Sequence, residues 1–536
     1  MNRAYFIAAG MMLVGMVATA TAADAPKSDK AAAAAESAKP FFTPTESKTS
    51  GSVTIDGRRI DYEAVAGTIV VHAKGYDDAP QTDKQKKAGK NPNAEASMFY
   101  AAYFKKGVAP GSRPITFLYN GGPGSATVWL HMGAFGPRKV VTNDHTHTPA
   151  APYQVINNGD SLLDASDLVF VDAPGTGFSR IAGKKKEKAF YGVDQDAHAF
   201  AEFIQAFISK YDRWNSPKYL FGESYGTPRS AVVSNMLQSD YSIDLNGVIL
   251  LSQILNFDLS VDGPESNPGI DTAYEVALPT YAATAWYHHK LPGKWKDLDT
   301  LRHAAEVFAM GDYAYALAKG SSLSDKARHD IAEKLHQFTG LPVDYLLRAN
   351  LRITGGVFEK HLQQDDDTTT GRLDTRFSGP TMDPLSKESY YDPQSAAISS
   401  AYVAAFNTYV RKTLDYGKGK TYKPSIGAWK FWDFKHKQPG ARFPSRGATN
   451  TMPDLATAMK YNPDLKILLA GGYYDLATPY YEGWYEMHHL PIPDKLQKNI
   501  EYRYYESGHM VYAHAASAKK LHDDVAAFIR RTDNVK

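Results

Sequence analysis

A glycine-flanked turn between a strand and a helix is the feature that most constrains the fold of this chain. The segment Gly-Glu-Ser-Tyr-Gly (222–226) follows the apolar strand Tyr219–Phe221 and precedes a helical pattern over residues 227–238. Flanking glycines let strand and helix approach each other, and the serine oxygen then projects beyond the carboxyl edge of the sheet. We therefore predict a strand–turn–helix unit that exposes Ser224 where open sheets bind ligands.

Strands and helices alternate along much of the chain after Pro114. Apolar residues recur at helical spacing over residues 193–212, and residues 517–531 form a closing helix. This alternation indicates a mostly parallel sheet with helices on both faces. The predicted strands of this part are Ile115–Tyr119, Leu168–Val171, Tyr219–Phe221, Val248–Leu251, Leu465–Ala470 and Tyr502–Tyr505.

The residues before Pro114 follow a different pattern. Asp56-Gly57 separates two short alternating runs, which is typical of a β-hairpin. We therefore expect antiparallel strands ahead of the mostly parallel sheet, and a polar loop over residues 74–94. The predicted strands of this part are Val53–Ile55, Arg59–Tyr62, Thr68–Val71 and Ser97–Tyr100.

A long insertion interrupts the alternation between residues 256 and 458. It contains helical patterns at residues 300–318 and 324–338 and lies between two predicted strands of the sheet. We expect an inserted helical cap or lid, with a separate domain as the alternative. The flanking segments, residues 51–255 and 459–536, would then be the two parts of one α/β core.

The first residues have the pattern of a secretory signal peptide. Arg3 precedes a mostly apolar run over residues 4–18, and small residues then recur in Ala-x-Ala spacing up to Ala22. We expect residues 1–22 to be a signal peptide and residues 23–50, rich in Ala, Lys and Ser, to be a disordered spacer. The chain is therefore expected to be exported, either to the periplasm or to the medium.

Composition excludes several kinds of chemistry and partner. The chain has no cysteine, which rules out disulfides, cysteine nucleophiles and thiolate metal sites. Its formal net charge of +2 gives no reason to expect a nucleic acid as partner. Beyond the N-terminal run, no segment is apolar and long enough for stable membrane insertion.

A serine hydroxyl needs a base, and the base needs an orienting carboxylate, before it acts as a nucleophile. Asp475 follows the predicted strand Leu465–Ala470, and His509 follows the predicted strand Tyr502–Tyr505. Both are therefore placed at the sheet edge that carries Ser224, in the chain order Ser, Asp, His that accompanies this type of turn. We predict Ser224, Asp475 and His509 to be the catalytic residues.

Other histidines fit a site less well. The adjacent pairs at 288–289 and 488–489 lie in helical stretches, where neighbouring side chains point in different directions. The segment Asp-His-Thr-His-Thr (144–148) has no evident third metal ligand. We expect neither a metal nor a cofactor, because the three catalytic groups need none.

A second glycine-rich turn supplies backbone donors to the same edge. Asn-Gly-Gly-Pro-Gly (120–124) directly follows the strand Ile115–Tyr119. Such an element often exposes amides that stabilise an oxyanion, together with the amide of the residue after the nucleophile, here Tyr225. An ordinary tight turn is the alternative. The convergence of three motifs on one edge favours an oxyanion hole.

Taken in order, these motifs resemble the signature blocks of the serine carboxypeptidases. The resemblance extends over residues 95 to 535 and implies the α/β-hydrolase fold. The segment Gly-Arg-Leu-Asp-Thr-Arg-Phe (371–377) is similar to one in bacterial members. The blocks are Asn-Gly-Gly-Pro-Gly-Ser (120–125), Asp-Ala-Pro-Gly-Thr-Gly-Phe-Ser (172–179), Gly-Glu-Ser-Tyr-Gly (222–226), Asp475-x-x-x-Pro479 and Gly-His-Met-Val (508–511).

The resemblance implies a role for each residue of the site. Ser224, Asp475 and His509 would form a catalytic triad, and the amides of Gly122 and Tyr225 would form the oxyanion hole. Members of the family are often dimers, so a homodimer is an assembly to expect.

The resemblance also implies a binding site for the C-terminal carboxylate of a peptide substrate. Asn120, the amide of Gly121 and Glu223 would hold that carboxylate. Glu223 must then be protonated, because two carboxylates in contact repel each other. The family accordingly works best in acid.

Three positions depart from the pattern of the family. The block that is usually Glu-Leu-Gly-Pro reads Ala-Phe-Gly-Pro (134–137), so Ala134 replaces a second carboxyl of the carboxylate site. Leu118 replaces a common tryptophan, and Tyr512 stands where the histidine block usually has proline. The requirement for a free C-terminus and the acid optimum therefore do not follow from the resemblance alone.

We interpret the chain as an exported serine carboxypeptidase that hydrolyses C-terminal peptide bonds through an acyl-enzyme on Ser224. An acyltransferase or esterase on the same fold is one alternative, which the absent carboxyl at Ala134 favours slightly. A peptidase without a strict need for a free C-terminus is another. A complete triad argues against a non-catalytic binding protein.

Overall fold

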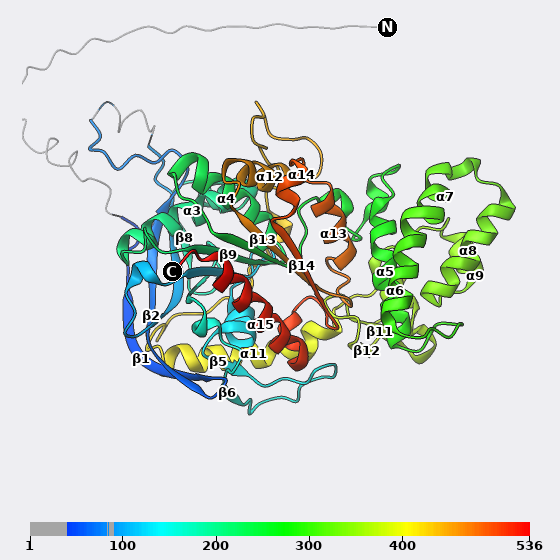
Figure 1. Cartoon of the computed structure of the whole chain (residues 1–536), viewed down its shortest axis with the longest axis horizontal. Helices are drawn as coiled ribbons and strands as arrows, with labels where there is room; N and C mark the ends of the chain where they lie inside the picture. Colours follow the sequence, from blue (N-terminus) through cyan, green and yellow to red (C-terminus); the bar gives the residue numbers. More distant parts are fainter. Residues whose placement is uncertain (1–39, 83, 85–90, 536) are drawn as a thin grey trace, which may run out of the picture. The chain divides into compact units, whose positions relative to one another are not determined.

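The computed structural model of the chain describes residues 40–82, 84 and 91–535 (Figure 1). The predicted signal peptide lies outside the described residues, as does most of the predicted spacer. The end of that spacer at residue 50 is wrong, because strand β1 (Glu46–Ile55) begins at Glu46. Residues Glu46 to Ser50 pair with the next strand in antiparallel register, so backbone hydrogen bonds order them despite their polar composition.

A ten-stranded mixed sheet forms the centre of the fold. Its order is β1-β2-β3-β7-β4-β9-β10-β13-β14, and β8 pairs with β3. The strands from β7 to β14 in this order run parallel, whereas β1, β2 and β3 are antiparallel to their neighbours. The remaining bounds are β2 (Arg58–His72), β3 (Glu95–Lys105), β4 (Ile115–Tyr119), β7 (Asp167–Val171), β8 (Arg180–Ala182), β9 (Lys218–Glu223), β10 (Gly247–Leu251), β13 (Lys466–Gly472) and β14 (Ile500–Tyr505).

Strand β2 corrects the prediction of two short strands in this region. The structure has one strand of 15 residues from Arg58 to His72. The small residues Ala64, Ala66 and Gly67 weaken the alternating pattern in its middle, yet residues 64–67 are paired throughout with β3. A Cβ atom on Gly67 would lie 2.7 Å from the carbonyl oxygen of Thr45, so the missing side chain allows a close backbone approach.

Helices cover both faces of the sheet, as the alternation predicts. Along β9 the side chains of Tyr219 and Phe221 enter one hydrophobic core, and Leu220 enters the other. The first core is closed by α11 (Pro393–Lys412) and α15 (Ala515–Thr532), and the second by α3 (Val193–Lys210), α4 (Gly226–Tyr241) and α12 (Met452–Tyr461). Shorter helices are α2 (Lys186–Phe190), α13 (Tyr480–His488) and α14 (Asp494–Gln497).

The insertion between β10 and β13 has two parts rather than one. Its first part is a group of helices with a hydrophobic core of its own, seen in green at the right of Figure 1. Its second part returns to the sheet, because α11 and α12 bury their apolar faces against the two main cores. The helices of the first part are α5 (Thr272–Tyr287), α6 (Leu298–Phe308), α7 (Ala314–Lys319), α8 (Asp325–Thr339), α9 (Val343–Arg348) and α10 (Gly355–His361).

The helix predicted over residues 300–318 is interrupted in the structure. Helix α6 ends at Phe308, and Gly311 has a non-helical backbone before α7 begins at Ala314. Glycine adopts such a conformation at little steric cost. Two short antiparallel pairs that the prediction missed are β5 (Arg138–Val140) with β6 (Val155–Asn157), and β11 (Thr368–Thr370) with β12 (Ser378–Pro380).

The sheet order, the parallel strands and the helices on both faces constitute an α/β-hydrolase fold. The carboxyl ends of β4, β9, β13 and β14 meet along one edge, and the loops that follow them carry the predicted site. Within the described residues, no helix combines the length and apolar character needed to cross a bilayer.

Candidate active site

Ser224 lies in the sharp turn between β9 and α4. Its φ of 60° is in the left-handed region, which a residue with a Cβ rarely adopts. The Ser224 amide donates a 3.0 Å hydrogen bond to the carbonyl of Leu251 at the end of β10. A Cβ atom on Gly222 would lie 2.1 Å from the carbonyl oxygen of Gly226, so glycine is required for this approach. The predicted turn is formed and presents Ser224 at the carboxyl edge.

The sheet brings Asp475 and His509 to the same edge from separate strands. Asp475 follows β13 and is fully buried, and His509 follows β14. The Nδ1 atom of His509 lies 2.8 Å from Oδ2 of Asp475. The amides of Ala477 and Thr478 donate to Oδ1 of Asp475 at 2.9 and 3.0 Å. These bonds fix the carboxylate in the orientation that holds the imidazole ring.

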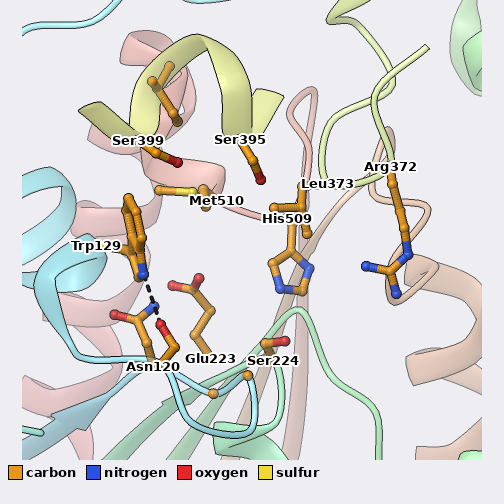
Figure 2. Close-up of a pocket in the computed structure, with 14 residues that line it drawn as sticks. Asn120, Trp129, Glu223, Ser224, Arg372, Leu373, Ser395, Ser399, His509 and Met510 are labelled. Carbon is orange, nitrogen blue, oxygen red and sulfur yellow. Dashed lines mark hydrogen bonds between the residues drawn. The ribbon is translucent and has the colours of Figure 1, made fainter. Parts of the chain in front are cut away.

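The contact with Asp475 controls the proton affinity of the histidine. Burial lowers the pKa of His509, but the charge of Asp475 and its hydrogen bond outweigh burial, so that the pKa lies above its ordinary value. With Nδ1 held by Asp475, Nε2 is left to accept a proton. Ser224 and His509 line the same pocket, and Figure 2 shows the distal edge of the ring directed toward Ser224. This arrangement can take a proton from a serine hydroxyl.

The glycine-rich turn after β4 packs directly against the turn of Ser224. A Cβ atom on Gly121 would lie 2.3 Å from the amide nitrogen of Tyr225, so the two backbones are in contact. Gly122 lines the pocket beside Ser224. Tyr225 precedes the first residue of α4, where the amides lack partners within the helix and the helix dipole favours negative charge. The amides of Gly122 and Tyr225 can thus stabilise an oxyanion at Ser224.

Glu223 points its carboxyl into the pocket, between Trp129 and His509 in the view of Figure 2. Burial raises the pKa of Glu223, whereas His509, the hydroxyl of Tyr512 and the side chain of Asn120 lower it, and the resulting pKa is about 7. A carboxyl with this pKa keeps its proton in mildly acidic solution. It can then donate a hydrogen bond to an anion.

Asn120 is held so that its side chain faces this carboxyl. Its Oδ1 accepts a 3.1 Å hydrogen bond from the amide of Leu130, which leaves the NH₂ group for Glu223. The backbone carbonyl of Asn120 accepts a 2.8 Å hydrogen bond from Arg229. Arg229 in turn forms a 2.6 Å ion pair with Asp196, and both side chains are fully buried. A buried ion pair therefore supports the turn that carries Asn120.

The pocket has two chemically different sides and a volume of about 230 Å³. Beside Glu223 its wall is apolar, with Trp129 and Met510 lining it (Figure 2). Arg372 lies on the opposite side of Ser224 and is ion-paired with Asp262. A carboxylate that enters next to Glu223 would therefore meet an apolar wall rather than a fixed cation.

The segment of residues 371–377 supports the site in a way that its sequence pattern did not reveal. The amide of His509 donates to the carbonyl of Leu373 at 2.6 Å, and the amide of Leu476 donates to the carbonyl of Arg372 at 3.1 Å. The segment thus holds both loops that follow β13 and β14. Its similarity to bacterial family members was the only signal in the sequence.

Tyr512 is a second contact that the sequence did not reveal. Its hydroxyl donates a 2.8 Å hydrogen bond to Oε2 of Glu223, and the side chain is buried. The replacement of the usual proline drew attention to this position, but no pattern in the sequence indicated its partner.

Three of the histidines outside the triad that the sequence singled out contact backbone carbonyls. Nε2 of His288 lies 2.6 Å from the carbonyl of Thr375. His488 and His489 each contact a backbone carbonyl one turn earlier in their own helix. In the described part of the chain, no group of three or more histidine and carboxylate side chains is arranged to hold a metal ion.

Comparison with known families agrees with the geometry of the site. Residues 85–265 match the model of the serine carboxypeptidase family. The matched segment contains the turn at residues 120–125 and the turn of Ser224, and it ends before Asp475 and His509. No curated protein matches the chain.

The chain is also similar to solved structures at low identity. An esterase from Thermogutta terrifontis is 12% identical, with 87% of this chain and 99% of that chain covered and a TM-score of 0.32. The proline iminopeptidase of Mycobacterium smegmatis is 12% identical, with 90% and 99% covered and a TM-score of 0.32. A peroxisomal α/β-hydrolase from Saccharomyces cerevisiae is 9% identical, with 91% and 90% covered and a TM-score of 0.31.

Proposed function

Because residues 85–265 match the serine carboxypeptidase family, we propose that this chain is a serine carboxypeptidase. The observation that carries the proposal is the position of Glu223. Its buried carboxyl, with a pKa of about 7, lies directly before Ser224 in the chain and lines the same pocket. A protonated carboxyl beside the nucleophile suits a substrate that presents a carboxylate next to the bond to be cleaved.

Ser224 attacks the carbonyl carbon of the last peptide bond in the proposed reaction. His509 takes the hydroxyl proton on Nε2 as the bond to Ser224 forms, and Asp475 stabilises the imidazolium. His509 then passes this proton to the nitrogen of the departing C-terminal residue as the C–N bond breaks. Water next attacks the acyl group on Ser224, with His509 again acting as the base, and the shortened peptide leaves.

The negative charge that develops on the carbonyl oxygen is stabilised by backbone amides. The amides of Gly122 and Tyr225 supply two hydrogen bonds, and the N-terminus of α4 adds the favourable end of its dipole. These donors are fixed by the contact between the two turns, so they need little reorganisation during the reaction.

The C-terminal carboxylate of the substrate binds to Asn120, the amide of Gly121 and Glu223. Asn120 donates through its NH₂ group, because Leu130 already occupies its oxygen. Glu223 donates through its proton, which it holds below a pH of about 7. This set places the last peptide bond of a substrate, rather than an internal one, at Ser224.

The order of products tests this proposal against the alternatives. An unstructured peptide is incubated with the protein, and the products are followed by mass spectrometry over time. A carboxypeptidase releases single residues successively from the C-terminus, and Ser224→Ala abolishes the release. Internal fragments would indicate an endopeptidase. Cleavage of simple esters without release of amino acids would favour the esterase or acyltransferase.

We also propose export, which rests on the pattern of residues 1–22. The N-terminal sequence of the mature protein, purified from a bacterial host, tests it. A new N-terminus after Ala20 or Ala22 in protein from the periplasm or medium supports export. An intact Met1 in protein from the cytoplasm contradicts it.

A further inference from the structure

The hydroxyl of Tyr512 occupies a defined position in the carboxylate site. It donates its hydrogen bond to Oε2 of Glu223 at 2.8 Å, and Tyr512 lies in the short helix Val511–Ala513 that directly follows the His509 loop. The side chain is 4% exposed, so water does not compete for this hydrogen bond. Its position couples Glu223 to the loop that carries the catalytic histidine.

Gly133 leaves the space that the ring of Tyr512 needs. A Cβ atom on Gly133 would lie 2.8 Å from a ring carbon of Tyr512 and 2.6 Å from the hydroxyl oxygen of Tyr402. The neighbouring Ala134 is buried and carries no polar group. The side of the site where a second carboxyl is absent is therefore packed with aromatic rings, and Tyr512 presents a phenol to Glu223.

The groups that face Glu223 come from several elements. Asn120, from the loop after β4, donates a hydrogen bond to it, and Asp475, after β13, repels its negative charge. His509, after β14, attracts that charge. Tyr402, on α11, is close enough to interact with Glu223. Arg372 lies across the pocket with its charge matched by Asp262.

A phenol and a carboxylic acid act differently on this glutamate. Two carboxyl groups in contact share one proton, which remains available over a wide pH range because two adjacent anions repel each other. The phenol of Tyr512 keeps its own proton, because burial raises its pKa well above the ordinary value. Its hydroxyl donates a hydrogen bond to Glu223 and so favours the ionised form of the glutamate.

We propose that Tyr512 is a positioning residue that orients Glu223 and limits the binding of the substrate carboxylate to acidic and neutral solution. By occupying Oε2, Tyr512 leaves Oε1 to carry the proton toward the substrate. By stabilising the carboxylate form, it makes Glu223 release that proton at a lower pH than it would without the phenol. This inference rests on the proposed carboxypeptidase function.

The pH dependence of KM in the wild type and in Tyr512→Phe tests the proposal. The substrate is a peptide with a free C-terminus. In the wild type, KM should rise as the pH increases through the pKa of Glu223, because the glutamate loses the proton that it donates to the substrate; we call this increase the alkaline rise. In Tyr512→Phe the alkaline rise should move to a higher pH by about 0.5 to 1 unit, because a hydrogen bond to the ionised form of Glu223 is lost. In acid, KM should rise several-fold while kcat changes little, because the orientation of Glu223 is lost.

Two further variants control this measurement. Tyr402→Phe removes a neighbouring buried hydroxyl that does not donate to Glu223 and should leave the alkaline rise unmoved. Glu223→Gln should remove the alkaline rise of KM in the range where Glu223 titrates. Labelling of Ser224 by a phosphonate, together with circular dichroism, shows whether each variant is folded. If Tyr512→Phe is not folded, Tyr512→His, which can donate from a ring nitrogen, should show the alkaline rise near its wild-type pH.

The outcomes separate this inference from the proposed function. An unmoved alkaline rise in folded Tyr512→Phe, or a fall in kcat alone, overturns the role of Tyr512. An alkaline rise that moves upward in folded Tyr512→His, despite the donor, overturns it too. Equal wild-type rates on the free peptide and its C-terminal amide overturn the carboxypeptidase function instead. If Tyr512→Phe shifts the alkaline rise of KM for the free peptide but not for an ester that lacks a carboxylate, both the role of Tyr512 and the carboxypeptidase function are supported.

Discussion

Asp374 accepts a 3.1 Å hydrogen bond from the amide of Gly508, the residue immediately before His509. The aspartate is fully buried and is also paired with Arg376 at 2.6 Å. A Cβ atom on Gly508 would lie 2.4 Å from the Cβ of Asp374, so loop and carboxylate are in direct contact. A residue of the insertion therefore helps to set the position of His509, the proposed catalytic base.

Replacement of Asp374 should lower turnover more than substrate binding. In Asp374→Asn the Gly508 amide can keep its acceptor, but Arg376 loses its charged partner and the loop shifts. We expect kcat to fall by about 10-fold to 100-fold, because small misplacements of a catalytic group have effects of this size. Steady-state kinetics measure the split between kcat and KM. An increase in KM with kcat unchanged would contradict this role.

The close contact of the two turns at the proposed oxyanion hole predicts a strong effect of a single methyl group. Gly121→Ala places a Cβ atom where the amide of Tyr225 lies 2.3 Å away. The turn must move, and at least one oxyanion donor is displaced with it. We expect kcat to fall by about 10²-fold to 10³-fold, the usual cost of losing one donor. Gly111→Ala, where the nearest atom is 3.7 Å away, is the matched control and should retain activity.

For the proposed carboxypeptidase, the apolar wall beside Glu223 predicts which C-terminal residues would be removed fastest. Trp129, Ile398 and Met510 line the part of the pocket that would hold the side chain of the departing residue. Peptides that end in Leu or Phe should exceed those that end in Asp by about 10-fold or more in kcat/KM. Trp129→Ala should reduce that ratio. A preference for acidic C-terminal residues would show that the side chain of the departing residue does not bind against this apolar wall.

A buried histidine far from the triad predicts a pH dependence of stability. His436 lies 2.6 Å from Asp194 and 2.7 Å from Asp454. Burial lowers the pKa of His436, but its hydrogen bonds to the two carboxylates outweigh burial and raise the pKa to about 9. Because the folded pKa exceeds the unfolded pKa of about 6.5, this contribution is complete below pH 6.5 and is lost as the pH rises through 9.

The difference in urea unfolding between the wild type and His436→Gln isolates this contribution. A pKa rise from 6.5 to about 9 corresponds to stabilisation on the order of 3 kcal/mol in acid. The stability advantage of the wild type should be present at pH 6 and should shrink toward pH 9.5. An advantage that does not change over this range would show that the histidine is not the titrating group.

The sequence predicted the parts of the fold that local pattern determines. The helices α3, α4, α8 and α15 carry continuous apolar faces or clear ends, and the structure has them within a few residues of the prediction. Strand β2 was divided because Ala64 to Gly67 interrupt the alternation. The two parts of the insertion were missed because only tertiary contacts show that α11 and α12 return to the sheet.

For the site, too, local sequence patterns could be predicted, whereas contacts between distant parts of the chain could not. Ser224, Asp475 and His509 could be proposed from the sequence because each lies within four residues of the end of a strand at one edge. The contacts of Asp374 and Tyr512 could not be found in this way. Asp374 belongs to the insertion, and its partner Gly508 lies more than a hundred residues later in the chain. Tyr512 and Glu223 are even farther apart in the chain, by 289 residues, and no local pattern couples them.

The most direct test of the central claim compares one peptide with its C-terminal amide. Both carry the same residues, and only the free peptide presents a carboxylate to Asn120 and Glu223. We predict that at pH 5 to 6 the amide is cleaved at least about 100-fold more slowly in kcat/KM, because the charge-assisted hydrogen bonds of the carboxylate are lost. Equal rates on the two peptides would contradict the assignment of this chain as a carboxypeptidase.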